Sequence, residues 1–235
     1  MAFLEDRLVP LIAAIIILLV GFPIHEFSHA WTADRLGDST ARFMGRISLD
    51  PRRHFDPMGG ILLLLSAVGF GIPLGWAKPT PINPANLRRG HRGEALVALA
   101  GPLSNLIMAT VVSISIRIIG ASPDLQATIA GSDFLSATFS VVVFFVWINV
   151  ILAFFNLIPI SPLDGWAVLK GFLSPLQAYQ YRYQLAQVER YGPMILIGLL
   201  AIGLIDPRIG PLQLVLGRVA AAAFSLLTGL ASPLG

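Results

Sequence analysis

Three ionisable side chains interrupt a long apolar stretch near the start of the sequence. Residues 21–35 read GFPIHEFSHAWTADR, so that His25, Glu26 and His29 lie among apolar neighbours. In a helix, two histidines four residues apart lie on one face, one turn apart. Imidazoles at this spacing can bind one zinc ion. A carboxylate that projects beside them without being a ligand can act as general base toward water that zinc has made acidic.

The pattern His-Glu-x-x-His is short, and in a soluble helix it would often occur by chance. Within a membrane segment each charged group costs about 2.5–3.5 kcal/mol at mid-helix on insertion scales, and such groups are rarely kept without a partner. The alternative is two histidines that only hydrogen-bond to neighbouring helices, with Glu26 at the water interface. We favour the metal site, because intramembrane ionisable residues are functional by default. Pro23 should loosen the preceding turn and admit water.

The composition predicts the membrane around this motif. Of 235 residues, 55% are hydrophobic and 12% charged, with a mean hydropathy of +0.76, whereas soluble domains have about 45–50% apolar and 25% charged residues. The small net charge of +3, with arginines in loops between apolar runs, indicates no nucleic-acid partner. The sequence has no cysteine, so disulfides, thiolate ligands and cysteine nucleophiles are excluded.

The apolar runs predict an all-α polytopic membrane protein with about five spanning helices. These runs are residues 8–31, 95–120, 134–159, 191–205 and 212–230. The run 59–70 is shorter, since about 12 residues cover only ~18 Å of helix against a hydrocarbon core of ~30 Å. We predict a short or re-entrant helix there. The glycines and prolines of residues 69–84 then predict an extended hairpin segment on the cytoplasmic side.

The distribution of Lys and Arg predicts the orientation in the membrane. Segments 34–56 and 76–93 carry five and four basic residues, which favours the cytoplasm for both. They can share that side only if residues 59–70 enter the membrane and return. The loop 121–133 has no Lys or Arg and is expected outside, whereas segment 164–190 has three and is expected inside. The N-terminus is therefore expected outside, with the first helix ending inside.

A third metal ligand is needed, because a catalytic zinc site has three protein ligands and one position for water. Asp164 is the candidate, in the segment NLIPISPLDGW at residues 156–166, where two prolines break the third long helix. With the predicted topology, the first and third long helices run in the same direction. The two histidines and Asp164 then all lie toward the cytoplasmic end.

Three motifs in this order resemble the site-2 protease family of intramembrane zinc metalloproteases: HExxH in an early helix, GPLSN at residues 101–105, and NLIPISPLDGW. The resemblance covers residues 23–166 and includes the GWAKPTPINP stretch. It implies a zinc ion held by His25, His29 and Asp164.

The same resemblance implies that Glu26 is the base that activates water and that Asn156 holds the substrate backbone near the metal. Asn105 is implied near the site, and we take it as a second substrate-binding candidate. Larger members carry PDZ and CBS regions, for which we see no room here. We expect one membrane-embedded domain over residues 1–235, with a catalytic core at about 8–166 and additional helices over 167–235.

The sequence thus predicts an intramembrane zinc metalloprotease that cleaves a transmembrane segment of its substrates in a prokaryotic cell membrane, with the active site toward the cytoplasm. Its expected partners are membrane-protein substrates and the lipid bilayer, while the sequence predicts no oligomeric state. The alternative is a metal-ion transporter or a non-proteolytic zinc-binding membrane protein. A transporter needs polar groups on both sides of the metal, whereas residues 9–20, 110–116 and 134–146 are nearly all apolar. This favours the enzyme.

Some polar and small residues have two interpretations. Gly101 and Asn105 belong to a small-residue face that either packs helices closely or lines the catalytic cleft. For Asn149 an interhelical hydrogen bond is the favoured role. His54 and His91 lie among arginines in loops and are expected to be solvated.

Overall fold

A computed structural model of the protein describes residues 2–70, 75–205 and 210–232, and within them it contains helices and no strand. This confirms the predicted all-α class. In chain order the elements are α1 (Ala2–Ile16), the π-helical turn η1 (Ile17–Gly21), α2 (Phe22–Arg35), α3 (Thr40–Phe43), η2 (Pro51–Arg53), α4 (Pro57–Phe70), η3 (Pro84–Asn86), α5 (His91–Gly120), α6 (Pro123–Ala130), α7 (Asp133–Asn156), α8 (Asp164–Gly171), α9 (Pro175–Gln180), α10 (Arg182–Ile205) and α11 (Pro211–Thr228).

Four helical stretches are long and apolar enough to cross a membrane. They are Leu8–Arg35, His91–Gly120, Asp133–Asn156 and Arg182–Gly203. The fifth predicted run corresponds to α11, whose described apolar part is the shorter stretch Leu214–Thr228. The described residues therefore give four long spans where the sequence predicted about five. The predicted run 191–205 is the apolar end of α10, which begins nine residues earlier, at Arg182.

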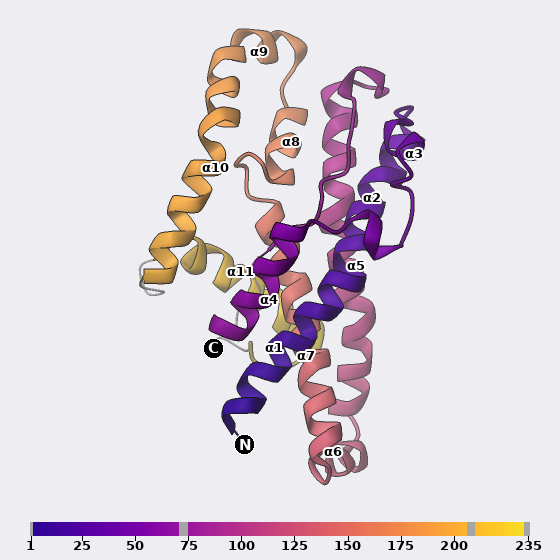
Figure 1. The fold of residues 1–235 in the computed structure, drawn as a ribbon, viewed down its shortest axis with the longest axis vertical. Helices are drawn as coiled ribbons and strands as arrows, with labels where there is room; N and C mark the ends of the chain where they lie inside the picture. The colour runs from indigo at the N-terminus through magenta and orange to yellow at the C-terminus, as the bar shows by residue number, and fades with distance from the viewer. Residues whose placement is uncertain (1, 71–74, 206–209, 233–235) are drawn as a thin grey trace.

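The helices form an elongated bundle (Figure 1). The α1–α2 rod and α7 run in one direction and α5 runs in the opposite direction, while α6 lies at one end and α3 and α9 at the other. The arginine-rich segments around α3 and before α5 are therefore at the end opposite the loop that lacks Lys and Arg. This agrees with the predicted separation of charged and uncharged loops.

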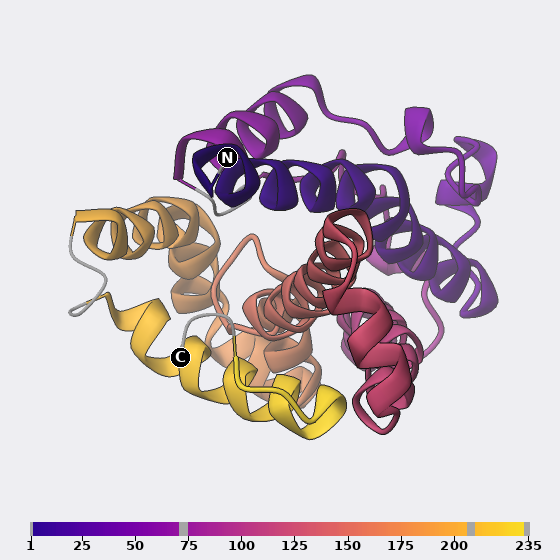
Figure 2. The ribbon, with the colours of Figure 1, turned by 90° about the horizontal axis from the view of Figure 1, so that it is seen from below.

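Helix α7 forms the centre of the bundle (Figure 2). On one side Phe145 and Ile148 belong to an apolar cluster with α1 and α4. On the other side Val146, Trp147 and Val150 pack with α5 and α11, and Trp147 meets the ring of Phe224 edge-on at a centroid distance of 5.5 Å. These contacts hold the C-terminal end of α7 beside α5.

The turn before the HExxH motif is loosened, as Pro23 predicts. A proline inside a helix has no N–H to donate and its ring clashes with the carbonyl four residues earlier. The chain adopts a π-helical turn over Ile17–Gly21, directly before α2. Such π turns are frequent at functional sites.

The short helix α4 has 14 residues, or ~21 Å of length, less than a bilayer core. Residues 75–83, called here the extended segment, follow it without regular structure; residues 71–74 of the predicted hairpin lie outside the described residues. A Cβ at Gly59 would lie 2.1 Å from Trp76 O, and one at Gly75 would lie 2.4 Å from Gly59 O. Glycine at both positions therefore lets α4 pack directly on the extended segment.

Loop residues fix the extended segment from outside the bundle. The Lys78 N–H donates to His54 O at 2.8 Å, and the Arg46 guanidinium donates to Lys78 O. Further along, the Asp38 carboxylate accepts from Asn83 N at 2.6 Å. Burial alone would raise the pKa of Asp38, but hydrogen bonds from Thr40, Asn83 and Asn86 outweigh it and hold that pKa below its ordinary value.

The expectation for His54 was wrong, whereas that for His91 holds. His54 is only 1% exposed, and its Nε2 lies 2.7 Å from Ser48 O, because the loop after α3 folds back under the extended segment. His91, at the start of α5, is exposed. Neighbouring arginines do not reveal whether a loop residue faces water or a second loop.

Candidate active site

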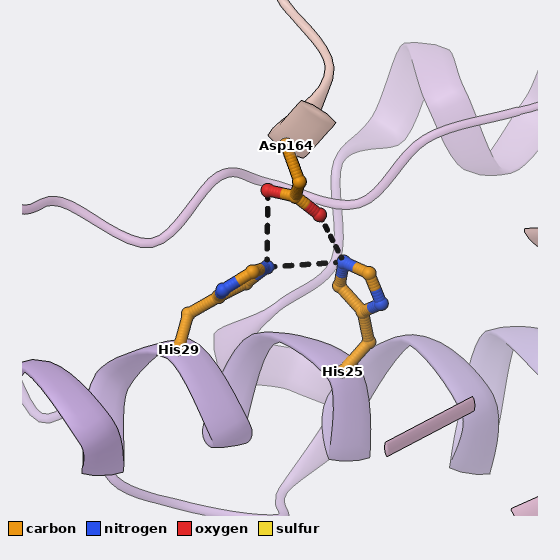
Figure 3. A group of neighbouring side chains, drawn as sticks. All are labelled: His25, His29 and Asp164. Atoms are coloured by element: carbon orange, nitrogen blue, oxygen red, sulfur yellow. Dashed lines mark hydrogen bonds and ion pairs between the residues drawn. The ribbon is translucent and has the colours of Figure 1, made fainter. Parts of the chain in front are cut away.

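Three predicted side chains meet at one point (Figure 3). His25 and His29 project from α2, and Asp164 comes from the first residue of α8. The two Nε2 atoms lie 3.1 Å apart, and the Asp164 carboxylate oxygens lie 3.3 Å from His25 Nε2 and 3.4 Å from His29 Nε2. Residues separated by more than 130 positions thus form one cluster.

The chain between α7 and α8 delivers Asp164 to this point. Helix α7 ends at Asn156, and extended backbone at Leu163 leads into α8. A Cβ at Gly165 would lie 2.2 Å from Leu157 O. The glycine of the LDG motif is therefore needed for α8 to begin directly against the end of α7.

Helix α5 orients both histidines through their second ring nitrogens. His29 Nδ1 lies 2.7 Å from Val97 O. A carbonyl oxygen only accepts, so Nδ1 carries the hydrogen and the neutral imidazole has its lone pair on Nε2, an assignment inferred from the hydrogen-bond partner.

His25 is oriented by a relay of two buried asparagines. Asn149 Nδ2 donates to Phe145 O, which turns its Oδ1 toward Asn105 Nδ2 at 2.9 Å. Asn105 Oδ1 is then the acceptor that faces His25 Nδ1 at 2.6 Å. By the same reasoning His25 Nδ1 carries its hydrogen and Nε2 its lone pair. The interhelical hydrogen bond expected for Asn149 is present.

The cluster fits a zinc ion. Two nitrogen lone pairs and a carboxylate converge with no hydrogen to share, and Asp164 Oδ2 is buried without a hydrogen-bond partner; such an arrangement is repulsive without a cation. Ligand atoms ~2.0–2.2 Å from a tetrahedral zinc ion lie roughly 3.3–3.5 Å from one another. The observed separations are similar: the two Nε2 atoms are 3.1 Å apart, Asp164 Oδ2 is 3.3 Å from His25 Nε2, and Asp164 Oδ1 is 3.4 Å from His29 Nε2.

Gly101 of the GPLSN motif gives the imidazoles their space. A Cβ at this position would lie 2.4 Å from His29 Nε2 and 2.6 Å from His25 Nε2. The small-residue face therefore packs α5 closely against α2, and this packing brings Asn105 and the Val97 carbonyl within reach of the histidines.

Glu26 is beside the cluster and is held by the extended segment. Its Oε2 accepts from Thr80 N at 2.8 Å and from Thr80 Oγ1 at 2.7 Å. The side chain lines a cavity of about 970 Å³, together with the two histidines and Asp164. A carboxylate in this position can exchange protons with water in the cavity.

The two asparagines predicted to bind substrate lie in different places. Asn156 lines the cavity, and its Nδ2 donates to Leu152 O at 2.9 Å, while no donor among the described residues reaches its Oδ1. Asn105 is fully buried behind His25. Its surroundings therefore favour a role in orienting the histidine over contact with a substrate.

A charged cluster lines the cavity between α5, α8 and α10. Lys170 Nζ lies 3.0 Å from Glu94 Oε1 and 3.0 Å from Glu189 Oε1, and the Trp166 indole also donates to Glu189. Burial alone would lower the pKa of Lys170, but the two carboxylates outweigh it and hold this pKa above its ordinary value. The cluster joins α5, α8 and α10.

Several of these contacts escaped the sequence-based prediction. The Val97 carbonyl carries no side-chain signal. Thr80 was missed although it lies between two prolines, a sequence typical of rigid extended backbone. The cluster around Lys170 joins residues from three helices whose packing the sequence does not specify.

Comparison with known proteins identifies the family. The model of peptidase family M50 matches residues 124–200, which include Asp164. "Putative zinc metalloprotease YwhC" of Bacillus subtilis is 34% identical over 183 residues, covering 78% of this chain and 77% of that protein. "Putative zinc metalloprotease Rip2" of Mycobacterium tuberculosis is 33% identical over 67% of this chain and 56% of its own length, and Rip2 of Mycolicibacterium smegmatis is 30% identical over 77% and 64%. No solved structure matches significantly.

The match to YwhC covers enough of both chains to assign the family. The chain spans about half to two thirds of the length of the Rip2 proteins. The M50 proteases use zinc, which agrees with the donor set described above. The all-helical bundle with its apolar spans, the cluster of donors and these relatives together identify the chain as a member of peptidase family M50, the site-2 protease family of zinc metalloproteases.

Proposed function

We propose that this protein is an intramembrane metalloprotease that cleaves a transmembrane segment of its substrates at the site formed by His25, His29, Asp164 and Glu26. The observation that carries the proposal is the convergence of these side chains in one cavity between helices long enough to span a membrane. Residues 1–235 would act as a single membrane domain, with the catalytic core at about 8–166.

The roles follow from the chemistry of each side chain. His25, His29 and Asp164 would hold zinc, which supplies Lewis-acid chemistry that makes water a nucleophile and polarises a carbonyl. Glu26 would accept a proton from the attacking water and later donate it to the leaving amine. Peptide hydrolysis is then balanced, because the water's two protons and its oxygen end on the two products.

The substrate must be unwound locally before it can react, because helical carbonyls are internally bonded and closed to attack. Residues 75–77 of the extended segment, which line the cavity, offer backbone that could pair with an unwound chain as a sheet edge does. Asn156, which lines the same cavity, would bind the substrate backbone through its Oδ1.

The charged loops support a cytoplasmic orientation for the active site. The loop after α3 carries Arg46, Arg52 and Arg53, and the residues before α5, which carry Arg88 and Arg89, lie near the C-terminal end of α2, where the Arg88 N–H donates to Leu36 O at 2.8 Å. If the positive-inside rule holds here, the cut falls toward the cytoplasmic leaflet of a prokaryotic cell membrane.

Reconstitution tests this proposal. Purified zinc-loaded protein in vesicles is incubated with synthetic single-span peptides of ~25 residues, in which Gly and Ser weaken the helix near either end. Mass spectrometry should locate the cuts within the span, toward one end only. Cuts confined to the soluble flanks would contradict the proposal. Zinc uptake into the vesicles without peptide cleavage would favour the transporter instead.

Asn105→Leu tests the histidine relay. Leucine has a similar volume but cannot accept the hydrogen of His25 Nδ1, so the imidazole loses its fixed orientation. Loss of such an outer partner typically weakens metal binding by roughly 10–100-fold. Competition with a chelator on the purified protein measures the change.

Ser113→Ala is the matched control for this relay. Among the described residues its buried hydroxyl bonds only Thr110 O of the same helix α5, so zinc affinity should stay at the wild-type level. Unchanged affinity in Asn105→Leu would show that the relay does not support the metal site.

A further inference from the structure

Thr80 makes three polar contacts to the proposed base through two donors, its backbone N–H and its hydroxyl. Its backbone N–H donates to Glu26 Oε2 at 2.8 Å, and its hydroxyl lies 2.7 Å from the same oxygen and 3.0 Å from the Glu26 backbone carbonyl. One threonine thus contacts both the side chain and the main chain of the glutamate, from a segment 54 residues further along the sequence.

The backbone around Thr80 is stiff. Pro79 and Pro81 fix their own φ angles, and each restricts the residue before it to extended conformations. In the tripeptide Pro79-Thr80-Pro81, the Thr80 N–H is the only backbone donor. Its direction is therefore set by the sequence as soon as the segment is anchored.

The anchors on either side of Thr80 hold the segment in place. Lys78 is bonded through both its N–H and its carbonyl to the loop after α3, by His54 and Arg46. Asn83 is bonded to Asp38 just beyond the end of α2. Thr80 is therefore presented to Glu26 by backbone that is fixed before any substrate binds.

The contact distinguishes the two oxygens of the carboxylate. Oε2 receives two donors, whereas within the described residues no donor reaches Oε1. A glutamate side chain without such contacts would populate several rotamers. With Oε2 held, Oε1 is the oxygen left to receive a proton from water in the cavity.

We propose that Thr80 is a positioning residue, which holds Glu26 by one carboxylate oxygen so that the other faces the reacting water. This inference rests on the proposed function of Glu26 as the base. Misplacement of a catalytic group by ~1 Å can cost about 10²-fold in rate, so positioning of this kind should appear in kcat.

Thr80→Val tests the inference, since valine has nearly the same shape and keeps the backbone N–H but lacks the hydroxyl. With the peptide that the wild-type protein cleaves best, kcat should fall roughly 10-fold to 100-fold, as expected for the loss of one hydrogen bond to a charged group, with KM unchanged. Thr80→Ser restores the hydroxyl and should restore kcat. Zinc content should equal that of the wild type in both variants.

Thr110→Val is the matched control, because in the part of the chain that the structure describes this hydroxyl bonds only Leu106 O within α5. It should leave kcat unchanged. An increase of kcat in Thr80→Val would show that Thr80 restrains the base in an inactive position, and a change of KM alone would show contact with the substrate. Either result would overturn the inference.

A second measurement needs no activity. In zinc-free protein, Thr80→Val should lower Tm in the wild-type background but not in a Glu26→Ala background, where the partner is absent. Equal losses in both backgrounds would refute the contact itself. If no peptide is cleaved by the wild type, the proposed function fails. The comparison of Tm in the two backgrounds, a double-mutant cycle, still tests the contact between Thr80 and Glu26.

Discussion

Glu26→Gln is expected to keep zinc and to lose proteolysis. The three proposed ligands remain, so the zinc content of the purified variant should equal that of the wild type. Glutamine has the size of glutamate and its amide oxygen can still accept from Thr80, so the fold and the extended segment are preserved. It cannot take a proton from water, and general-base catalysis contributes about 10²–10⁴-fold to a rate. Cleavage of the single-span peptide should fall by this factor.

Ser28→Ala provides the comparison within the same motif. Ser28 precedes the proposed ligand His29, and its hydroxyl bonds Ile24 O of its own helix, so peptide cleavage should continue. Normal cleavage by Glu26→Gln would remove Glu26 from the mechanism. Loss of zinc from Glu26→Gln would instead show that Glu26 supports the metal site, which the proposal does not include.

Asp164→Ala is expected to lose zinc. The two histidines are neutral donors in the tautomers inferred here, so Asp164 supplies the only negative charge among the proposed ligands. Without it, a divalent cation in a largely buried site would have two ligands and no compensating charge. The loss of affinity should therefore exceed the roughly 10–100-fold caused by removing an outer partner. Metal analysis of the purified variant measures this.

Asp133→Ala is the matched control for a lost helix-terminal carboxylate. Asp133 begins α7 as Asp164 begins α8, but it is exposed and outside the cavity. Its removal should leave zinc content unchanged. If Asp164→Ala also retains the zinc stoichiometry of the wild type, Asp164 is not a ligand.

Helix α5 organises the site although it supplies none of the proposed ligands. Through Gly101 it approaches α2, and through Val97 and Asn105 it fixes both imidazoles. The GPLSN motif thus has a physical explanation. Gly101 permits the close approach of α5 to α2, and this approach brings Asn105 within hydrogen-bonding distance of His25.

The sequence alone determined the features that depend on local pattern. Composition and run length predicted a helical membrane protein, and spacing within one helix placed His25 and His29 on one face. The prolines of NLIPISPLDGW predicted the break after which Asp164 follows. Such features need no knowledge of neighbours, because a helix period, a missing N–H or an excess of apolar residues acts within a few residues.

Only the tertiary structure decided what surrounds these groups. The bonds from His29 to Val97 O and from Thr80 to Glu26 join residues 68 and 54 positions apart. The burial of His54 and the relay through Asn105 depend on which loop or helix lies opposite. These outcomes depend on how whole elements pack together, and a backbone carbonyl or a threonine has no residue type that reveals its partner in advance.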